Sequence, residues 1–189
     1  WVREALGLPQ LATLHDILFL RPDAFAADDP LLADESWLAG TSADLRASAA
    51  VFAPSEWLAQ LARDRVPGLV VTVVPNGSSV SSAREVLPPR AAFASARPKH
   101  VVALLGALGP HKGSDFVDAI AGHLSGSDVA LVAIGYLDRQ VHPGWRVPGR
   151  LFIHGAFEEG DATGLLRGYD AKLALFAGTV PESFGYALS

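Results

Sequence analysis

The sequence predicts an α/β protein whose sheets are mostly parallel. Short apolar runs, several of them rich in β-branched residues, alternate along the chain with segments whose apolar residues recur at helical spacing. This alternation is typical of strand–helix–strand units, in which helices cover both faces of a parallel sheet. Half of the 189 residues are hydrophobic, which is enough for one large or two small α/β layers with real cores.

The first half of the chain is expected to contain three strands and two helices. In chain order we expect a strand at 11–14, a loop-like stretch at 19–30, a helix at 42–50 capped by Ser42, a strand at 49–53, a helix at 55–63 capped by Ser55, and a strand at 69–74. In the second of these helices, Trp57, Leu58 and Leu61 are expected to share one apolar face.

A composition change predicts the domain boundary. The strand at 69–74 runs into Pro75-Asn76-Gly77, a turn signal, and a stretch rich in Ser, Pro and Ala then continues to about Pro98. We therefore expect a first domain at 1–77, a linker at 78–98 and a second domain at 99–189.

The second domain has a regular strand and helix pattern. Its expected elements are a strand at 100–105, a glycine turn at 106–113, a helix at 114–124, strands at 129–134 and 151–154, a helix at 161–168, a strand at 171–176, a loop at 178–183 and a further helix from Phe184. The apolar positions of the first helix follow the helical period; they are Phe116, Val117, Ile120, Ala121 and Leu124.

The glycine turn at 106–113 is a candidate phosphate site. Glycines let the backbone approach a ligand closely, the amides at the start of the following helix favour an anion, and Lys112 adds a full positive charge. The spacing is neither that of a Walker A motif nor Gly-x-Gly-x-x-Gly. An ordinary strand-to-helix turn with a solvated lysine is the alternative.

Two further positions can act on a substrate. Glu182 precedes an expected helix with a glycine in its first turn, so its carboxylate can accept from sugar hydroxyls while the amides of Ser183, Phe184, Gly185 and Tyr186 face a diphosphate. His15, at the carboxyl end of the first strand, can contact substrate or exchange a proton. The alternatives are that Glu182 only complements the helix dipole and that His15 and Asp16 only form a turn.

Charge and composition exclude several functional classes. A net charge of −5 argues against a general nucleic-acid binder, and the absence of cysteine excludes disulfides and thiolate metal sites. The six histidines form no metal-binding motif, and neither Asp-x-Asp nor Gly-x-Ser-x-Gly occurs, so we expect no metal and no serine hydrolase chemistry. No apolar run reaches the length of a membrane span, and a cytoplasmic protein is expected.

The order of these motifs resembles that of GT-B glycosyltransferases of the GT4 type. The shared pieces are Val51-Phe52-Ala53-Pro54-Ser55-Glu56, Val73-Val74-Pro75-Asn76-Gly77, the turn with Lys112-Gly113, Ile134-Gly135, Gly155, and Pro181-Glu182-Ser183-Phe184-Gly185. The amino-acid sequences of the turn (106–113) and of the last segment (181–189) are most similar to those of bacterial enzymes of cell-surface polysaccharide assembly. The resemblance implies two Rossmann-like parallel-sheet domains. Because the sequence opens on Trp1 and contains no Met, the N-terminal domain is expected to be only partly present.

The resemblance also implies a role for each candidate residue. Lys112, with Gly106 and Gly113 beside it, would hold the donor diphosphate, and Gly155, Ala156 and Phe157 would lie along the nucleobase. Glu182 would contact the donor sugar as the first glutamate of the family's Glu-x7-Glu motif, whose second glutamate would fall one position beyond Ser189.

His15 matches the family histidine on the acceptor side. One position departs from the family pattern: Ala107 stands where an arginine is usual.

The function implied is transfer of a hexose or 6-deoxyhexose from a nucleotide-diphosphate donor to a glycan or lipid-linked glycan acceptor, with retention and without metal or cofactor. The protein would be cytoplasmic, with peripheral association with the inner membrane as an option. Two alternatives stay open: a non-catalytic nucleotide-sugar-binding module of a polysaccharide assembly protein, and a GT-B sugar-nucleotide epimerase.

Overall fold

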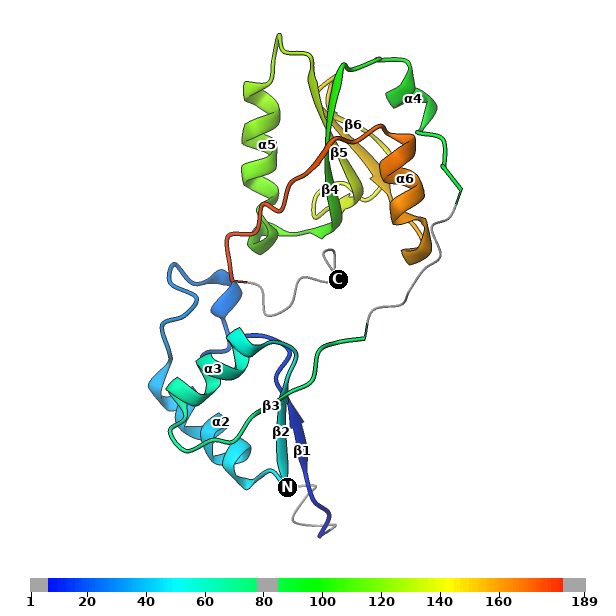
Figure 1. Ribbon diagram of the computed structural model, residues 1–189. Coiled ribbons are helices and arrows are strands. Elements are labelled where there is room, and N and C mark those ends of the chain that lie inside the picture. Colours follow the sequence, from blue (N-terminus) through cyan, green and yellow to red (C-terminus); the bar gives the residue numbers. More distant parts are fainter. Residues whose placement is uncertain (1–6, 78–84, 182–189) are drawn as a thin grey trace. The chain divides into compact units, whose positions relative to one another are not determined.

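The computed structural model describes residues 7–77 and 85–181, which fold into two compact units (Figure 1). Among these residues, the first unit comprises 7–77 together with Val180 and Pro181, and the second comprises 85–179. Each unit has its own sheet and its own hydrophobic core. The chain therefore returns to the first unit directly after Thr179.

The first unit is a three-stranded parallel sheet in the order β1-β2-β3. Its strands are β1 (Leu11–Thr13), β2 (Ala50–Ala53) and β3 (Thr72–Val73), and its helices are the 3₁₀ helix η1 (Ala24–Ala26), α2 (Glu35–Ala47) and α3 (Glu56–Arg65). Figure 1 shows α2 and α3 on the same side of this sheet. The expectation of two covered faces is therefore not met by the described helices here, and Leu11, Val70 and Val74 are exposed.

Helix α2 begins seven residues earlier than predicted. Asp34, rather than Ser42, is the N-cap, and its carboxylate accepts a hydrogen bond of 3.0 Å from the amide of Trp37. Glu35 in the first turn adds a favourable interaction with the helix dipole. Ser42 is instead buried in the middle of the helix. The helix starts earlier because Leu38, Ser42 and Leu45 together form the face that packs on the core.

Helix α3 confirms the predicted cap and corrects the predicted face. The Ser55 hydroxyl accepts from the amide of Leu58 at 3.3 Å, and the helix continues to Arg65. Leu58 is fully buried and Leu61 packs partly against the core, as predicted, whereas Trp57 is 41% exposed. The remaining buried positions are the alanines at 59 and 62, so the core under this helix is filled by small side chains rather than by an indole.

The second unit is a five-stranded sheet in the order β6-β7-β5-β4-β8, in which only the β6–β7 pair is antiparallel. Its strands are β4 (His100–Leu108), β5 (Val129–Leu137), β6 (Gly144–Val147), β7 (Leu151–Gly155) and β8 (Leu173–Ala174). Its helices are α4 (Ala91–Ala94), η2 (Pro110–Lys112), α5 (Ser114–His123), η3 (Glu159–Asp161) and α6 (Ala162–Gly168).

Helices cover both faces of this sheet, as predicted. Helix α5 lies on one face, and α6 and α4 lie on the other (Figure 1). Val117 and Ala121 of α5 are fully buried against one core, while Leu165 of α6 and Phe93 of α4 belong to the core on the opposite face. Phe116 of α5, expected in the core, is 53% exposed.

Strand lengths differ from the predictions. Strands β4 and β5 continue to Leu108 and Leu137 rather than ending at 105 and 134, and their pairing is unbroken to the end. Gly106 and Gly135 lie inside the paired region, so they extend the strands rather than starting a turn. Strand β6 forms in a stretch expected to be a loop, and β8 and β3 are shorter than predicted.

Part of the predicted linker packs on the second unit. Phe93 is buried, and its ring lies 4.8 Å from that of Tyr169 and 5.6 Å from that of Trp145, between ring centroids. The Trp145 indole N–H donates to the carbonyl of Ala92 at 3.2 Å. Residues 85–98 thus form part of this unit. A composition rich in Ser, Pro and Ala did not reveal this, because one large side chain is enough to anchor the segment.

Candidate functional site

The candidate site lies at the carboxyl edge of the second unit's sheet, where ligands bind in open parallel sheets. Three glycines with positive φ stand side by side there: Gly106 on β4, Gly135 on β5 and Gly155 on β7, with φ of +97°, +127° and +90°. A Cβ on Gly135 would lie 2.0 Å from the carbonyl oxygen of Gly106, so no side chain fits. A Cβ on Gly106 would meet nothing within 4 Å, so its backbone borders open space.

The turn that carries Lys112 starts later than the sequence indicated. It runs from Gly109 to Gly113 through η2, and its backbone is held by Lys112 N–H donating to Gly109 O at 3.0 Å and Gly113 N–H donating to Pro110 O at 2.9 Å. Gly113 takes φ +77°, a conformation that favours glycine. The side chain of Lys112 is exposed and makes no hydrogen bond or ion pair with any described residue.

Helix α5 begins directly after this turn. The Ser114 amide donates back to the carbonyl of Gly109 at 3.2 Å, so the amides of Asp115 and Phe116 are the helix-start donors at this edge. Ser114, its first residue, is 1% exposed, and its hydroxyl has no hydrogen-bond partner among the described residues. A buried hydroxyl without a partner is uncommon and calls for a ligand or water. The sequence analysis did not select Ser114, because a serine at a helix start is first interpreted as a cap.

Arg139, which no sequence pattern indicated, neutralises a carboxylate in the first turn of α5. Asp115 would oppose an anion at this helix start, but the guanidinium of Arg139 pairs with it at 2.9 Å. Arg139 follows β5 and also lies 3.7 Å from the carboxylate of Asp138. Lys112 is therefore the cation of this turn that has no carboxylate partner among residues 7–77 and 85–181.

The connection that follows β8 lies directly on the Lys112 turn. A Cβ on Gly113 would be 2.0 Å from the carbonyl oxygen of Ala177, and the amide of Thr179 donates to the carbonyl of His111 at 3.1 Å. Because β8 and β4 are neighbouring parallel strands, their carboxyl ends meet at one edge. The chain toward Glu182 thus starts beside Lys112. Glu182, Ser183, Phe184, Gly185 and Tyr186 themselves lie outside the described residues.

The remaining predicted residues are placed as follows. Gly155 ends β7 at the same edge as Gly106. Ala156 and Phe157 follow it, with Ala156 exposed and Phe157 packed partly against the core. His15 is exposed and belongs to the first unit. The neighbouring Asp16 accepts from the amide of Leu18 at 2.8 Å, which is a turn contact.

Behind the glycine row, a buried histidine is tied to the segment that enters the second unit. Nδ1 of His154 lies 2.8 Å from the hydroxyl of Tyr169, which accepts from the amide of Arg90 at 3.3 Å. Burial, with a smaller contribution from the charge of Arg90, lowers the pKa of His154. Burial raises the pKa of Tyr169. A neutral His154 that accepts a hydrogen bond from the Tyr169 hydroxyl is consistent with both pKa shifts.

The described residues contain no group of three or more His, Asp or Glu side chains placed to hold a metal ion. None of the helices at 7–77 and 85–181 is long and apolar enough to cross a membrane.

No family model and no curated protein matches the sequence, but solved structures match the fold. HepE from Anabaena, in complex with UDP and glucose, matches with a TM-score of 0.65 and 19% identity over 98% of this chain and 50% of its own. The same protein in complex with UDP-glucose gives a TM-score of 0.64 at 19% identity, covering 98% of this chain and 51% of its own.

Sucrose-phosphate synthase from Thermosynechococcus elongatus gives a TM-score of 0.64 at 17% identity, covering 98% of this chain and 48% of its own. The chain therefore spans about half the length of these structures. It has an α/β fold of the GT-B type, built from Rossmann-like units with parallel sheets.

Proposed function

We propose that this chain is the nucleotide-sugar-binding part of a glycosyltransferase, which moves a sugar from a nucleotide-diphosphate donor to a glycan acceptor. The observation that carries the proposal is the α5 start. Lys112 is exposed and stands two residues before Ser114, and among the described residues neither its ammonium nor the buried Ser114 hydroxyl has a hydrogen-bond or ion-pair partner. A diphosphate can pair with the Lys112 ammonium and with the amides of Asp115 and Phe116 at the helix start.

The glycine row supports the rest of the donor. With no side chain at Gly106 and with the exposed Ala156 directly after β7, a flat nucleobase and ribose can lie against backbone, although the Pro143 ring occupies the Cβ side of Gly155. The likeness to HepE, whose structures contain UDP and UDP-glucose, adds to this proposal at the level of the fold.

In the proposed reaction the glycosidic bond of the donor breaks, and negative charge grows on the leaving diphosphate. The ammonium of Lys112 and the α5 amides stabilise that charge, so these groups contribute most in the transition state. Glu182 would accept from the donor sugar hydroxyls, and His15 would face the acceptor side. Retention of configuration, a bacterial surface polysaccharide as product and a cytoplasmic location are parts of the same proposal.

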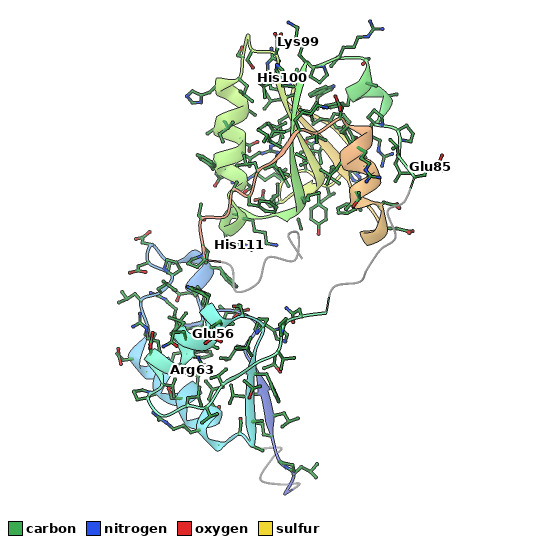
Figure 2. All side chains as sticks on the ribbon, in the orientation of Figure 1. Glu56, Arg63, Glu85, Lys99, His100 and His111 are labelled. Carbon is green, nitrogen blue, oxygen red and sulfur yellow. The ribbon has the colours of Figure 1, made fainter. Side chains whose placement is uncertain are left out.

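Calorimetry with UDP, GDP and dTDP, with and without EDTA, tests the binding step. We expect weak binding of at least one nucleoside diphosphate that persists in EDTA. Lys112→Ala should weaken it. Lys99→Ala is the matched control: Lys99 stands at the amino end of β4, paired with Asp128 at 2.7 Å. Figure 2 shows Lys99 and His100 at the opposite end of the second unit from His111. Equal losses in the two variants would contradict the proposed site.

The second candidate function is a non-catalytic nucleotide-sugar-binding module. Ala107 favours it, because the position that carries an arginine in the resembling family has no charge here. Wild-type protein that binds a nucleotide-sugar but transfers the sugar to no acceptor and does not hydrolyse it would support the module over the enzyme.

A further inference from the structure

The geometry of the second unit points to a positioning role for Thr179. We propose that the connection after β8, residues 177–179, holds the Lys112 turn in its binding geometry, and that Thr179 is the residue through which it acts. This inference rests on the proposed function for its consequence, but its structural half can be tested without any ligand.

The first support is a double hydrogen bond to one carbonyl. The carbonyl oxygen of His111 accepts from the amide of Thr179 at 3.1 Å and from its hydroxyl at 3.3 Å. His111 directly precedes Lys112 and belongs to η2. Since η2 is a single short turn, fixing the direction of this carbonyl also fixes the peptide plane from which Lys112 projects.

The second support is the absence of space between the two segments. The backbone of Gly113 approaches Ala177 so closely that a Cβ would lie 2.0 Å from the Ala177 carbonyl oxygen and 3.0 Å from its Cβ. Ala177 is itself buried in the core beside α5. The turn therefore packs against the buried Ala177 and is also hydrogen-bonded to Thr179 of the same connection.

The third support is where the connection leads. Val180, the next residue, packs against the hydrophobic core of the first unit. The chain on either side of Thr179 is thus anchored, by Ala177 in one unit and by Val180 in the other. Thr179 is the residue of that path that bonds to the Lys112 turn.

Substitutions with matched controls test this role, with UDP as the probe. Thr179→Val keeps the branched shape and the amide but loses the hydroxyl donor, and should weaken UDP binding by about 2- to 10-fold. Thr179→Ser, which restores the donor, should recover most of the affinity. A structural role without positioning would lower the thermal midpoint of Thr179→Val without changing its affinity for UDP, and would overturn the proposal.

Gly113→Ala tests the close approach. It should weaken UDP binding by about 10-fold or more, because the turn must move away from Ala177. Gly126→Ala is the matched control, since Gly126 has a similar φ of +79° but open space around its Cβ position. It introduces the same left-handed strain. Equal effects of the two substitutions on UDP binding would show that backbone strain, not the contact with Ala177, is responsible.

Amide hydrogen exchange of Lys112 and Gly113 in the free protein provides the second measurement. In the Thr179→Val variant, these two amides should exchange faster than in wild type, whereas the exchange rates of amides in the interior of α5 should be unchanged. Unchanged exchange at Lys112 and Gly113 would refute the positioning role. If the wild type bound no nucleoside diphosphate, the proposed function would fail, and the exchange result would still decide the role of Thr179.

Discussion

Lys112 and Lys99 carry the same charge at opposite ends of β4, but their surroundings differ. Lys99 is paired with Asp128, and that hydrogen bond raises its pKa. Lys112 faces solvent at a helix start with no carboxylate partner among the described residues. A lysine that the fold leaves uncompensated beside helix amides is available for an anionic ligand, whereas Lys99 is already neutralised.

If the full-length protein is the proposed glycosyltransferase, Lys112→Ala should lower kcat by about 10²- to 10³-fold, on the order of 3–4 kcal/mol, as for loss of one preorganised oxyanion donor. The donor KM should rise less, because the charge on the diphosphate grows as the bond breaks. Lys112→Arg should restore little, since a planar fork does not replace a compact ammonium. Steady-state kinetics with the donor measures both constants. An unchanged kcat with a raised KM would assign Lys112 to ground-state binding only.

Arg139 should matter through Asp115. Arg139→Ala leaves the Asp115 carboxylate uncompensated in the first turn of α5, so UDP affinity should fall by about 2- to 5-fold at low salt, as expected of an exposed ion pair. Asp115→Asn in the same background should restore the affinity, because the repulsive charge is then gone. Calorimetry at low and high salt measures this. A loss that persists in the double variant would mean that Arg139 contacts the nucleotide directly.

His154 should make the stability of the second unit depend on pH. Its folded-state pKa lies below the ordinary value of 6.5, so the unfolded chain binds a proton more readily. The stabilising contribution is then fully present above about pH 6.5 and is lost as the pH falls below it. Urea unfolding at about pH 5.5 and about pH 8 measures the difference. His154→Gln should reduce it. An equal pH dependence in that variant would assign the effect to other groups.

At the scale of the elements, the glycines of α6 and α5 differ in the space around them: Gly168 is tightly packed and Gly122 is not. The segment that enters the second unit crosses α6 so closely that a Cβ on Gly168 would lie within 1.6 Å of the Leu87 carbonyl oxygen. A Cβ on Gly122 of α5 would meet nothing within 4 Å. Leu87 and Phe93 extend this contact into the core, so the close crossing holds α4 against the sheet.

Gly168→Ala should therefore destabilise the protein by about 1–3 kcal/mol through steric overlap. Gly122→Ala should be neutral or stabilise it by up to about 1 kcal/mol, because alanine favours a helix. Chemical denaturation followed by circular dichroism compares the two variants. A Gly168→Ala variant as stable as wild type would show that the segment at 85–93 can move away from α6 without cost.

At the scale of the whole molecule, the two units have separate cores, and the donor site as proposed lies in the second. UDP at 100 times its dissociation constant should stabilise that unit by about 2.7 kcal/mol. Fluorescence of Trp145, which is stacked on Phe93, reports on this unit, and Trp37 and Trp57 report on the first. Thermal unfolding of variants that keep only one of these reporters should show a UDP-dependent shift for Trp145. An equal shift at Trp57 would mean that the units unfold together.

Much of the second unit could be predicted from the sequence. The starts of β4, β5 and β7, the whole of α5 and the helices on both faces follow from local periodicity, because these elements bury their apolar residues in the order in which the chain presents them. The position of the Lys112 turn at the carboxyl edge of the sheet could also be predicted, because a turn that follows a parallel strand lies at the carboxyl end of that strand.

The sequence could not predict what depends on contacts between distant segments. Ser114 and Thr179 look ordinary in the sequence, and the glycines at 106 and 135 look like turn residues. Their roles arise because β8 pairs with β4 and brings Ala177 against Gly113, and because neighbouring strands align their glycines across the sheet. The early start of α2 has a similar cause, since its buried face is decided by the core.

The sequence by itself determined the fold class, the motif order and the lysine turn, because hydrophobic periodicity and glycine chemistry are local properties of the chain. The tertiary structure decided where each strand ends, that the Ser114 hydroxyl has no partner among the described residues, and that Thr179 bonds to the Lys112 turn. Those outcomes depend on the distance between segments more than 60 residues apart, such as His111 and Thr179, and no local pattern encodes that distance.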